Sequence, residues 1–183
     1  MPHSDLDRQR QKWRHFPRRR PARIKTPEPG QESVWDYPRP PRVEPVERRV
    51  RVEFAGVCLA ESHRALRVLE TSSPPCYYLP STDVRAEHLQ PSPTTSFCEW
   101  KGVAHYLSAC VGERRAEDAA WTYPDPDSGF EVLRDHLAFF AGRVDACFLG
   151  DVRVRAQPGR YYGGWITPEI VGPFKGEPGS EDW

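Results

Sequence analysis

The stretch Thr95–Tyr106 reads TSFCEWKGVAHY and brings a thiol, an ammonium, an imidazole and three aromatic rings close together in the sequence. Gly102 interrupts it, and glycine adopts the backbone conformations of tight turns without steric cost. We therefore predict a turn over residues 99–100. In a regular strand the odd spacing of Cys98 and Lys101 would put them on opposite faces of a sheet, whereas a turn brings their side chains together.

Apolar segments on both sides of this stretch predict a mainly β domain built from short antiparallel strands. In residues 48–54, RRVRVEF, the side chains of Val50, Val52 and Phe54 alternate with charged ones, which is the pattern of a strand with one buried face. Similar signals recur at short intervals, as in antiparallel β folds. Further strands are predicted at residues 65–70, 76–79, 103–111 (buried on both sides) and 119–123, with a final hairpin over residues 144–155.

One short helix is predicted among these strands. Residues 128–131, SGFE, match a capping box, in which the Ser and Glu side chains bind backbone N–H groups at a helix start. Phe130, Leu133 and Leu137 then follow at helical spacing. The expected fold is therefore a small antiparallel β domain with one short helix and extended flanks.

The two ends of the chain differ in composition from its centre. Residues 1–31 form a basic, proline-rich arm, which we expect to be extended or disordered because few aliphatic side chains offset its ordering entropy. Residues 32–156 hold the predicted β domain, on which Trp35 and Tyr37 are expected to dock. Residues 157–183 are rich in glycine, proline and aromatic residues, and we expect this tail to pack on the domain or on a neighbouring subunit.

The composition argues against several classes of protein. No apolar run approaches the roughly 20 residues that span a bilayer, and the polar, basic N-terminus does not resemble a secretory signal. The five cysteines are widely spaced without a Cys-x-x-Cys pair, so we expect reduced thiols, a cytoplasmic location and no metal site. Asp125 and Asp127 alternate with prolines and are better explained by a turn than by a metal. No phosphate-binding loop or nucleophile elbow is present, and no cofactor is predicted.

Aromatic side chains gather in the central part of the chain, and converging rings typically form pockets for apolar or flat ligands, although they also occur in ordinary cores. Arginine and lysine in such a pocket would hold an anionic or carbonyl group. Arg67 lies in an otherwise apolar run, which favours partial burial and a specific partner. We therefore predict a small-molecule pocket lined by Arg67, Tyr78, Cys98, Lys101, Tyr106 and Trp121.

Two other functions stay open. In the first, the chain is an enzyme with Cys98 as its nucleophile, because the ammonium of Lys101 would favour the thiolate. One of His63, His88 and His105 would then act as the base. In the second, the chain is an interaction module without a pocket, whose basic arm and aromatic tail bind a partner. That partner could be a second copy of the chain or, through the arm, a single-stranded nucleic acid.

Several segments occur together in a characteristic order. They are ALRVLET at residues 65–71, YY at 77–78, KG at 101–102, AWTYP at 120–124 and LAFF at 137–140. This set resembles the bacterial and fungal family known as domain of unknown function 427. The flanking segments ESVWDYP (32–38) and YGGWITP (162–168) are similar to those of its actinobacterial members. The resemblance implies a small mainly β domain similar to the β-tent architecture of cereblon-type ligand-binding domains, and it implies no activity and no catalytic residue.

Overall fold

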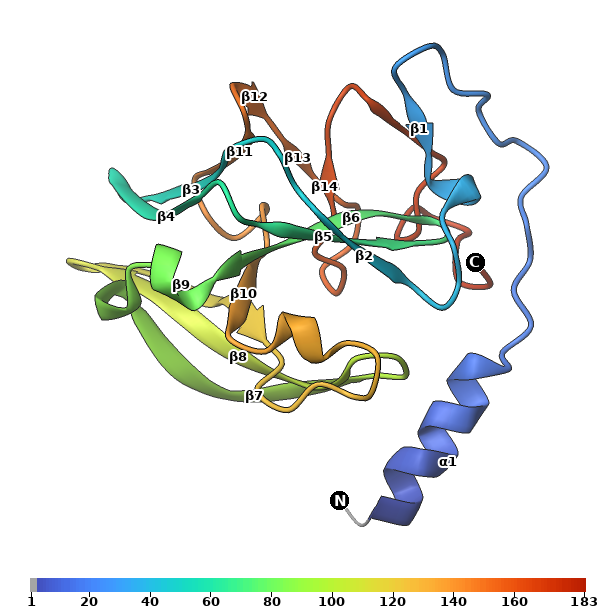
Figure 1. The fold of residues 1–183 in the computed structure, drawn as a ribbon, viewed down its shortest axis with the longest axis horizontal. Coiled ribbons are helices and arrows are strands. Elements are labelled where there is room, and N and C mark those ends of the chain that lie inside the picture. The colour runs from blue at the N-terminus through green and yellow to red at the C-terminus, as the bar shows by residue number, and fades with distance from the viewer. Residues whose placement is uncertain (1–2) are drawn as a thin grey trace.

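The structure is a computed structural model that describes residues 3–183. Within this range it contains two larger antiparallel sheets, two short strand pairs and one α-helix (Figure 1). The prediction of a mainly antiparallel β domain with a single helix is confirmed. The position of that helix differs from the one expected.

The larger sheet has seven strands and the smaller sheet has four. In spatial order the larger sheet contains β2 (Arg42–Pro45), β5 (Leu66–Glu70), β6 (Ser73–Pro80), β10 (His136–Phe139), β9 (Arg114–Thr122), β8 (Gly102–Val111) and β7 (Leu89–Cys98). The smaller sheet contains β12 (Val152–Arg153), β11 (Ala146–Leu149), β3 (Val50–Phe54) and β4 (Val57–Ser62). The two short pairs are β1 (Glu32–Ser33) with β15 (Ile170–Val171), which is parallel, and β13 (Arg155–Ala156) with β14 (Trp165–Ile166).

The core between the two larger sheets consists of almost fully buried apolar side chains. Val50 and Val52 of β3 are 0% exposed, and they share one cluster with Leu79 of β6 and Phe139 of β10. The alternation predicted for β3 is present, since its charged residues are only half-buried. Each large apolar side chain buried in this way contributes about 1.5–3 kcal/mol to folding.

The opposite face of the seven-stranded sheet is also covered, by a second apolar cluster that is rich in rings. Tyr78, Trp121 and Phe140 belong to it, while their neighbours Leu79 and Phe139 belong to the core between the sheets. Successive side chains of a strand point to opposite faces. The central strands are therefore buried on both sides, which explains why their sequences are continuously apolar.

The α-helix α1 (His3–Arg14) lies in the arm that we expected to be extended or disordered. The sequence from residue 3 to residue 16 has no glycine or proline, and the pairs Asp5–Arg8 and Asp7–Arg10 support the helix at i,i+3 spacing. The helix expected after residue 128 is reduced to a single 3₁₀ turn, because Asp135 has a φ of +60° and β10 begins directly after it. The 3₁₀ turns are η1 (Val34–Asp36), η2 (Ser81–Asp83), η3 (Ala86–His88) and η4 (Glu131–Leu133).

The arm and the tail pack on the domain and on each other. After α1 the chain runs along one side of the molecule to β1 (Figure 1). Trp35 donates its indole N–H to the backbone oxygen of Pro173 at 2.9 Å, and Arg19 N donates to Asp182 O at 2.7 Å. A buried cluster joins the two flanks and contains Val34, Trp35, Tyr37, Leu69, Ile166, Ile170 and Phe174.

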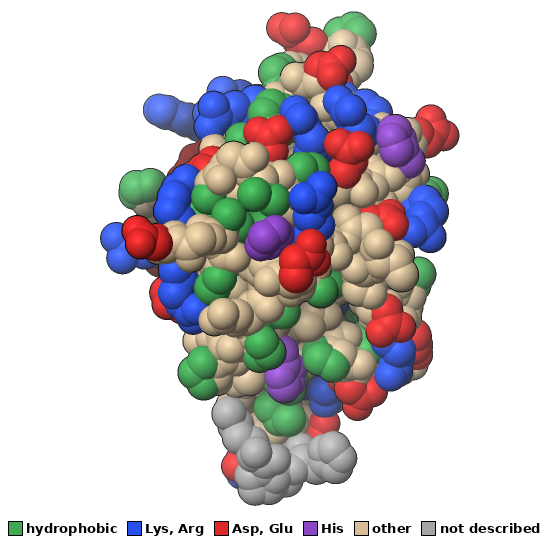
Figure 2. All heavy atoms as spheres, turned by 90° about the vertical axis from the view of Figure 1, so that its left-hand side faces the viewer, with side chains coloured by type: hydrophobic (Ala, Val, Ile, Leu, Met, Phe, Trp, Pro, Cys, Tyr) green, Lys and Arg blue, Asp and Glu red, His purple; other side chains and the backbone are tan. Residues whose placement is uncertain are grey.

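Basic and acidic side chains are interspersed on the face shown in Figure 2. This matches a sequence with 26 basic and 26 acidic residues. No helix in residues 3–183 combines the length and the apolar character needed to cross a membrane.

Candidate functional site

A pocket of about 670 Å³ lies over the ring-rich face of the seven-stranded sheet. Strands β5, β6 and β9 supply its floor, the hairpin of β7 and β8 one wall, and residues of the arm and the tail its remaining sides. Its size falls within the roughly 300–1,000 Å³ of typical small-molecule sites. Of the six predicted ligand-binding residues, the pocket is lined by Tyr78, Cys98, Lys101, Tyr106 and Trp121.

The aromatic floor of the pocket arises from strand register. Tyr78, Ala138, Trp121 and Tyr106 are direct cross-strand partners on four neighbouring strands, so they form one row on the same face. Because Ala138 is small, the rings on either side of it meet, and Trp121 Nε1 donates to Tyr78 Oη at 3.1 Å. Phe140 packs on this row, with its ring 4.5 Å from that of Trp121 and stacked on that of Tyr106. The row is a rigid apolar surface on which a ligand can lie.

The tail covers part of this row through a close backbone contact. A Cβ placed on Gly163 would lie 2.2 Å from the ring of Trp121, so only glycine permits the approach. Tyr161, Tyr162 and Gly163 all line the pocket. The tail therefore helps to enclose the pocket.

Lys101 is the only lysine that the central domain contributes to this pocket. It ends the turn at residues 99–101, and the following Gly102 has a φ of +93°, as the predicted turn requires. The side chain is 8% exposed, and its Nζ lies 5.9 Å over the ring of Tyr123. Among residues 5–183, whose side chains the structure describes, Nζ has no hydrogen-bond or ion-pair partner. Burial lowers the pKa of Lys101, but Cys98, Tyr78 and Glu70 raise it, and the net shift is upward. Lys101 is therefore a charged ammonium at neutral pH.

Two thiols also border the pocket. Cys98 lies at the end of β7, with its Sγ 4.0 Å from an oxygen of Glu99, and Cys76 lies on β6. Burial raises the pKa of Cys76 to about 12, so this thiol is protonated at neutral pH. Among the residues that line the pocket, no histidine is present. The bases that we considered for a Cys98 nucleophile lie elsewhere.

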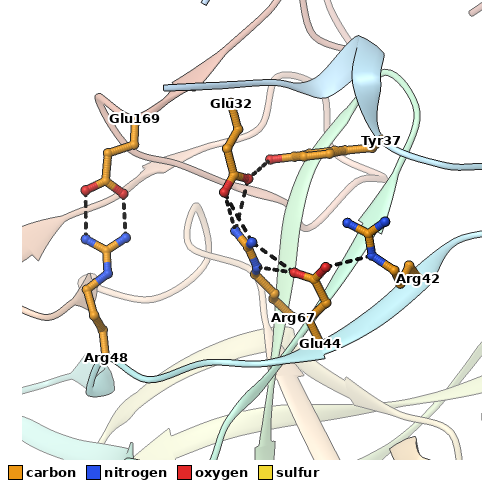
Figure 3. Close-up of polar contacts among 7 residues, drawn as sticks. All are labelled: Glu32, Tyr37, Arg42, Glu44, Arg48, Arg67 and Glu169. Atoms are coloured by element: carbon orange, nitrogen blue, oxygen red, sulfur yellow. Dashed lines mark hydrogen bonds and ion pairs between the residues drawn. The ribbon is translucent and has the colours of Figure 1, made fainter. Parts of the chain in front are cut away.

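Arg67, which we expected in the pocket, lies on the opposite face of the sheet. Side chains alternate along β5, so Val68 lines the pocket while Arg67 points away from it. Figure 3 shows its guanidinium between Glu32 and Glu44, with distances of 3.0 and 2.9 Å. Tyr37 donates its hydroxyl to Glu32 in the same group. Arg67 thus links β1, β2 and β5 through its ion pairs.

Three cations at the pocket were not predicted from the sequence: Arg18, Arg39 and Lys175. Arg39 donates to both Glu70 and Glu99. Arg18 donates to the backbone oxygen of Trp183 at 2.7 Å and to Glu99 at 3.3 Å. Arg18 comes from the arm, Arg39 from the segment before β2, and Lys175 from the tail. All three are far from the central stretch in the sequence, and no local sequence pattern predicts their position at the pocket.

A second, smaller cavity of about 440 Å³ lies beside α1. Asp125 and Asp127 border it, and Asp127 accepts two hydrogen bonds from Arg10, at 2.9 and 2.6 Å. Among residues 5–183, whose side chains the structure describes, no cluster of three or more His, Cys, Asp or Glu side chains could hold a metal ion. Through its hydrogen bonds with Arg10, Asp127 holds α1 against the domain.

A comparison with family models finds a match that covers more than half of the chain. The model described as Domain of unknown function (DUF427) covers residues 42–150. This range contains most of both larger sheets and the turn that carries Lys101, but it leaves out the arm and the tail. No curated protein matches the chain.

Proposed function

Because the chain belongs to the DUF427 family, whose description assigns no activity, we propose its function from the pocket. The domain binds a small molecule that has an apolar part and an anionic group. The observation that carries this proposal is the ammonium of Lys101, which is 8% exposed and makes no hydrogen bond or ion pair with the described side chains, although it lies 5.9 Å over the ring of Tyr123. A charge removed from water is costly unless it is paired. An anionic ligand group would supply that pair.

The row of Tyr78, Trp121 and Tyr106 supports an apolar part for the same ligand. Aromatic faces bind rings and other apolar groups, and the hydroxyls of tyrosine can orient them. Ala104 is 1% exposed and lies beneath the pocket, where its small side chain leaves room above the sheet. The pocket therefore combines an apolar floor with the positive charge of Lys101 beside it.

Enzyme chemistry at Cys98 has less support than binding. A cysteine nucleophile needs a base or a strongly favoured thiolate, and no histidine is among the residues that line the pocket. Lys101 is an ammonium and so cannot act as a nucleophile. A protein-interaction role also has less support, because the arm and the tail make their contacts with their own domain.

Calorimetric titration with naphthalene sulfonate and with neutral naphthol tests the proposal. Wild-type protein is expected to bind one equivalent of the sulfonate. Lys101→Met should weaken this binding roughly tenfold or more, because hydrogen bonds to charged groups contribute about 1.5–3 kcal/mol. The same substitution should weaken binding of naphthol much less. Lys25→Met is the control, because Lys25 is exposed and outside the pocket.

A second variant keeps the test decisive if Lys101→Met does not fold. Ala104→Leu leaves Lys101 in place and fills the space above the floor, so it should abolish binding of both probes. Unchanged sulfonate binding in Lys101→Met or in Ala104→Leu would overturn the proposal.

A further inference from the structure

The rings that line the pocket lie at different depths. Tyr78 and Trp121 on the floor are 1% and 6% exposed, and Lys101 is buried to a similar extent. Trp13 of the arm and Tyr161 of the tail line the same pocket but are 41% and 61% exposed. The pocket therefore has an inner part, which holds the positive charge of Lys101, and a mouth that is bordered by two exposed rings.

Two of the three exposed large apolar side chains lie at this mouth. Among residues 5–183, whose side chains the structure describes, the third is Val132, and it does not line the pocket. Single exposed apolar side chains are normal on soluble proteins, whereas apolar surface gathered in one place is typical of a binding site. Trp13 and Tyr161 come from opposite ends of the chain and border one opening, so the second description applies to them.

The docking of α1 on the domain directs Trp13 toward the pocket. Arg10 donates to Asp127 at 2.9 and 2.6 Å, and Arg14 donates to a backbone oxygen of the turn after β7 at 2.9 Å. Residues four apart are neighbours on one side of a helix, so Arg10 and Arg14 form one row, which faces the domain. Gln9 and Trp13 form the adjacent row, and both line the pocket.

Each exposed ring is supported by an aromatic neighbour in its own segment. The ring centroids of Trp13 and Phe16 are 5.6 Å apart. Those of Tyr161 and Tyr162 are 5.2 Å apart, with an angle of 88° between the ring planes. Aromatic pairs at such separations attract each other. The two rings are therefore partly ordered before a ligand arrives, which reduces the entropy lost on binding.

We infer that this mouth is a second apolar subsite, in which Trp13 and Tyr161 contact a part of the ligand that extends outward from the floor. The inference rests on the proposed function and specifies its ligand class: an elongated amphiphile with a deep anionic group and an apolar outer end. Covering the two rings removes apolar surface from water, which is favourable in proportion to the area covered. The volume of about 670 Å³ agrees with a drug-sized molecule, which is larger than one bicyclic ring system.

Calorimetric titrations with two sulfonates test this inference. Anilinonaphthalene sulfonate carries the charged ring system of naphthalene sulfonate and adds a second aromatic group. One equivalent of it is expected to bind roughly tenfold more tightly, because the added ring is covered at the mouth, and naphthalene sulfonate should displace it. Equal affinities, or binding of the two probes without competition, would overturn this inference and leave the proposed function intact. Failure of both probes to bind would overturn both.

Variants of the two exposed rings test where the additional affinity arises. Trp13→Ala and Tyr161→Ala should each reduce the ratio of the two affinities several-fold and change binding of naphthalene sulfonate much less. Alanine has the highest helix propensity, so Trp13→Ala preserves α1, and Tyr161→Ala does not alter the helix at all. Val132→Ala is the matched control, since Val132 is exposed and apolar but outside the pocket. A ratio that is unchanged in both ring variants would overturn the assignment.

Discussion

The two faces of the seven-stranded sheet are built from the same strands and serve different purposes. Toward the four-stranded sheet, Leu79 and Phe139 are 0% exposed in a core that is filled by side chains. Toward the arm and the tail, their neighbours Tyr78 and Phe140 border a pocket of about 670 Å³. Protein interiors are normally close-packed. A pocket of this size on the second face therefore lowers the free energy of unfolding relative to a face filled by side chains.

The difference shows how one set of strands can be both scaffold and site. The core between the sheets fixes the strands, and the strands then hold Tyr78, Trp121 and Tyr106 in register above the opposite face. Sites placed on such elements are held more precisely than sites on loops. Stability and binding should therefore respond differently to changes on the two faces.

The largest difference is expected for two adjacent phenylalanines. Phe139→Ala removes a ring from the filled core and should lower the free energy of unfolding by about 3–5 kcal/mol. Phe140→Ala should cost roughly half as much, because its ring already borders open space, yet it should weaken binding of naphthalene sulfonate. Urea denaturation and calorimetry measure the two effects. Equal losses of stability would contradict the distinction between the faces.

A smaller effect is expected where the tail covers the pocket. Gly163→Ala would place a Cβ 2.2 Å from the ring of Trp121, so the tail or the ring must shift. We expect a loss of about 1–3 kcal/mol in unfolding free energy, as is typical of overpacking, together with weaker ligand binding. In Gly142→Ala the nearest atom would be 3.4 Å away, and this variant should retain near-normal stability and binding. If Gly163→Ala behaved like this control, the tail would not cover the pocket.

The smallest effect is expected for Arg67, whose guanidinium is on the side away from the pocket. Arg67→Gln breaks its pairs with Glu32 and Glu44 and should lower the unfolding free energy by about 1 kcal/mol, since these carboxylates are partly exposed. Ligand affinity should stay unchanged in calorimetry. A clear loss of affinity would return Arg67 to the binding site. The more exposed pair of Arg48 and Glu169, also drawn in Figure 3, is the natural comparison, and Arg48→Gln should cost less.

Local sequence patterns were sufficient to predict part of this structure. Gly102 predicted the turn that puts Lys101 beside Cys98, and the alternation in residues 50–54 predicted a strand with one buried face. Both features depend on a few consecutive residues. The many aromatic residues in the central part of the chain likewise predicted a pocket. They did not indicate which of these residues are cross-strand partners.

Other features depend on contacts between distant residues. The position of Arg67 is decided by which face of β5 is turned to the pocket, and a shift of one residue in register reverses that choice. Arg18 and Lys175 meet at the pocket only because the arm and the tail pack together. Helix α1 formed where the composition of the whole arm suggested extended chain, because the prolines of the arm lie outside residues 3–16.

The seam at which Arg18 and Arg19 meet Asp182 and Trp183 has a practical consequence. A protein trimmed to residues 42–150 would keep the seven-stranded sheet but lose the arm and the tail, which cover part of its aromatic face. Trp121 and Tyr106 would then face water, and a bare aromatic surface of that kind promotes self-association. Any shortened form of the chain that is meant to report on this cavity must therefore retain both flanking segments.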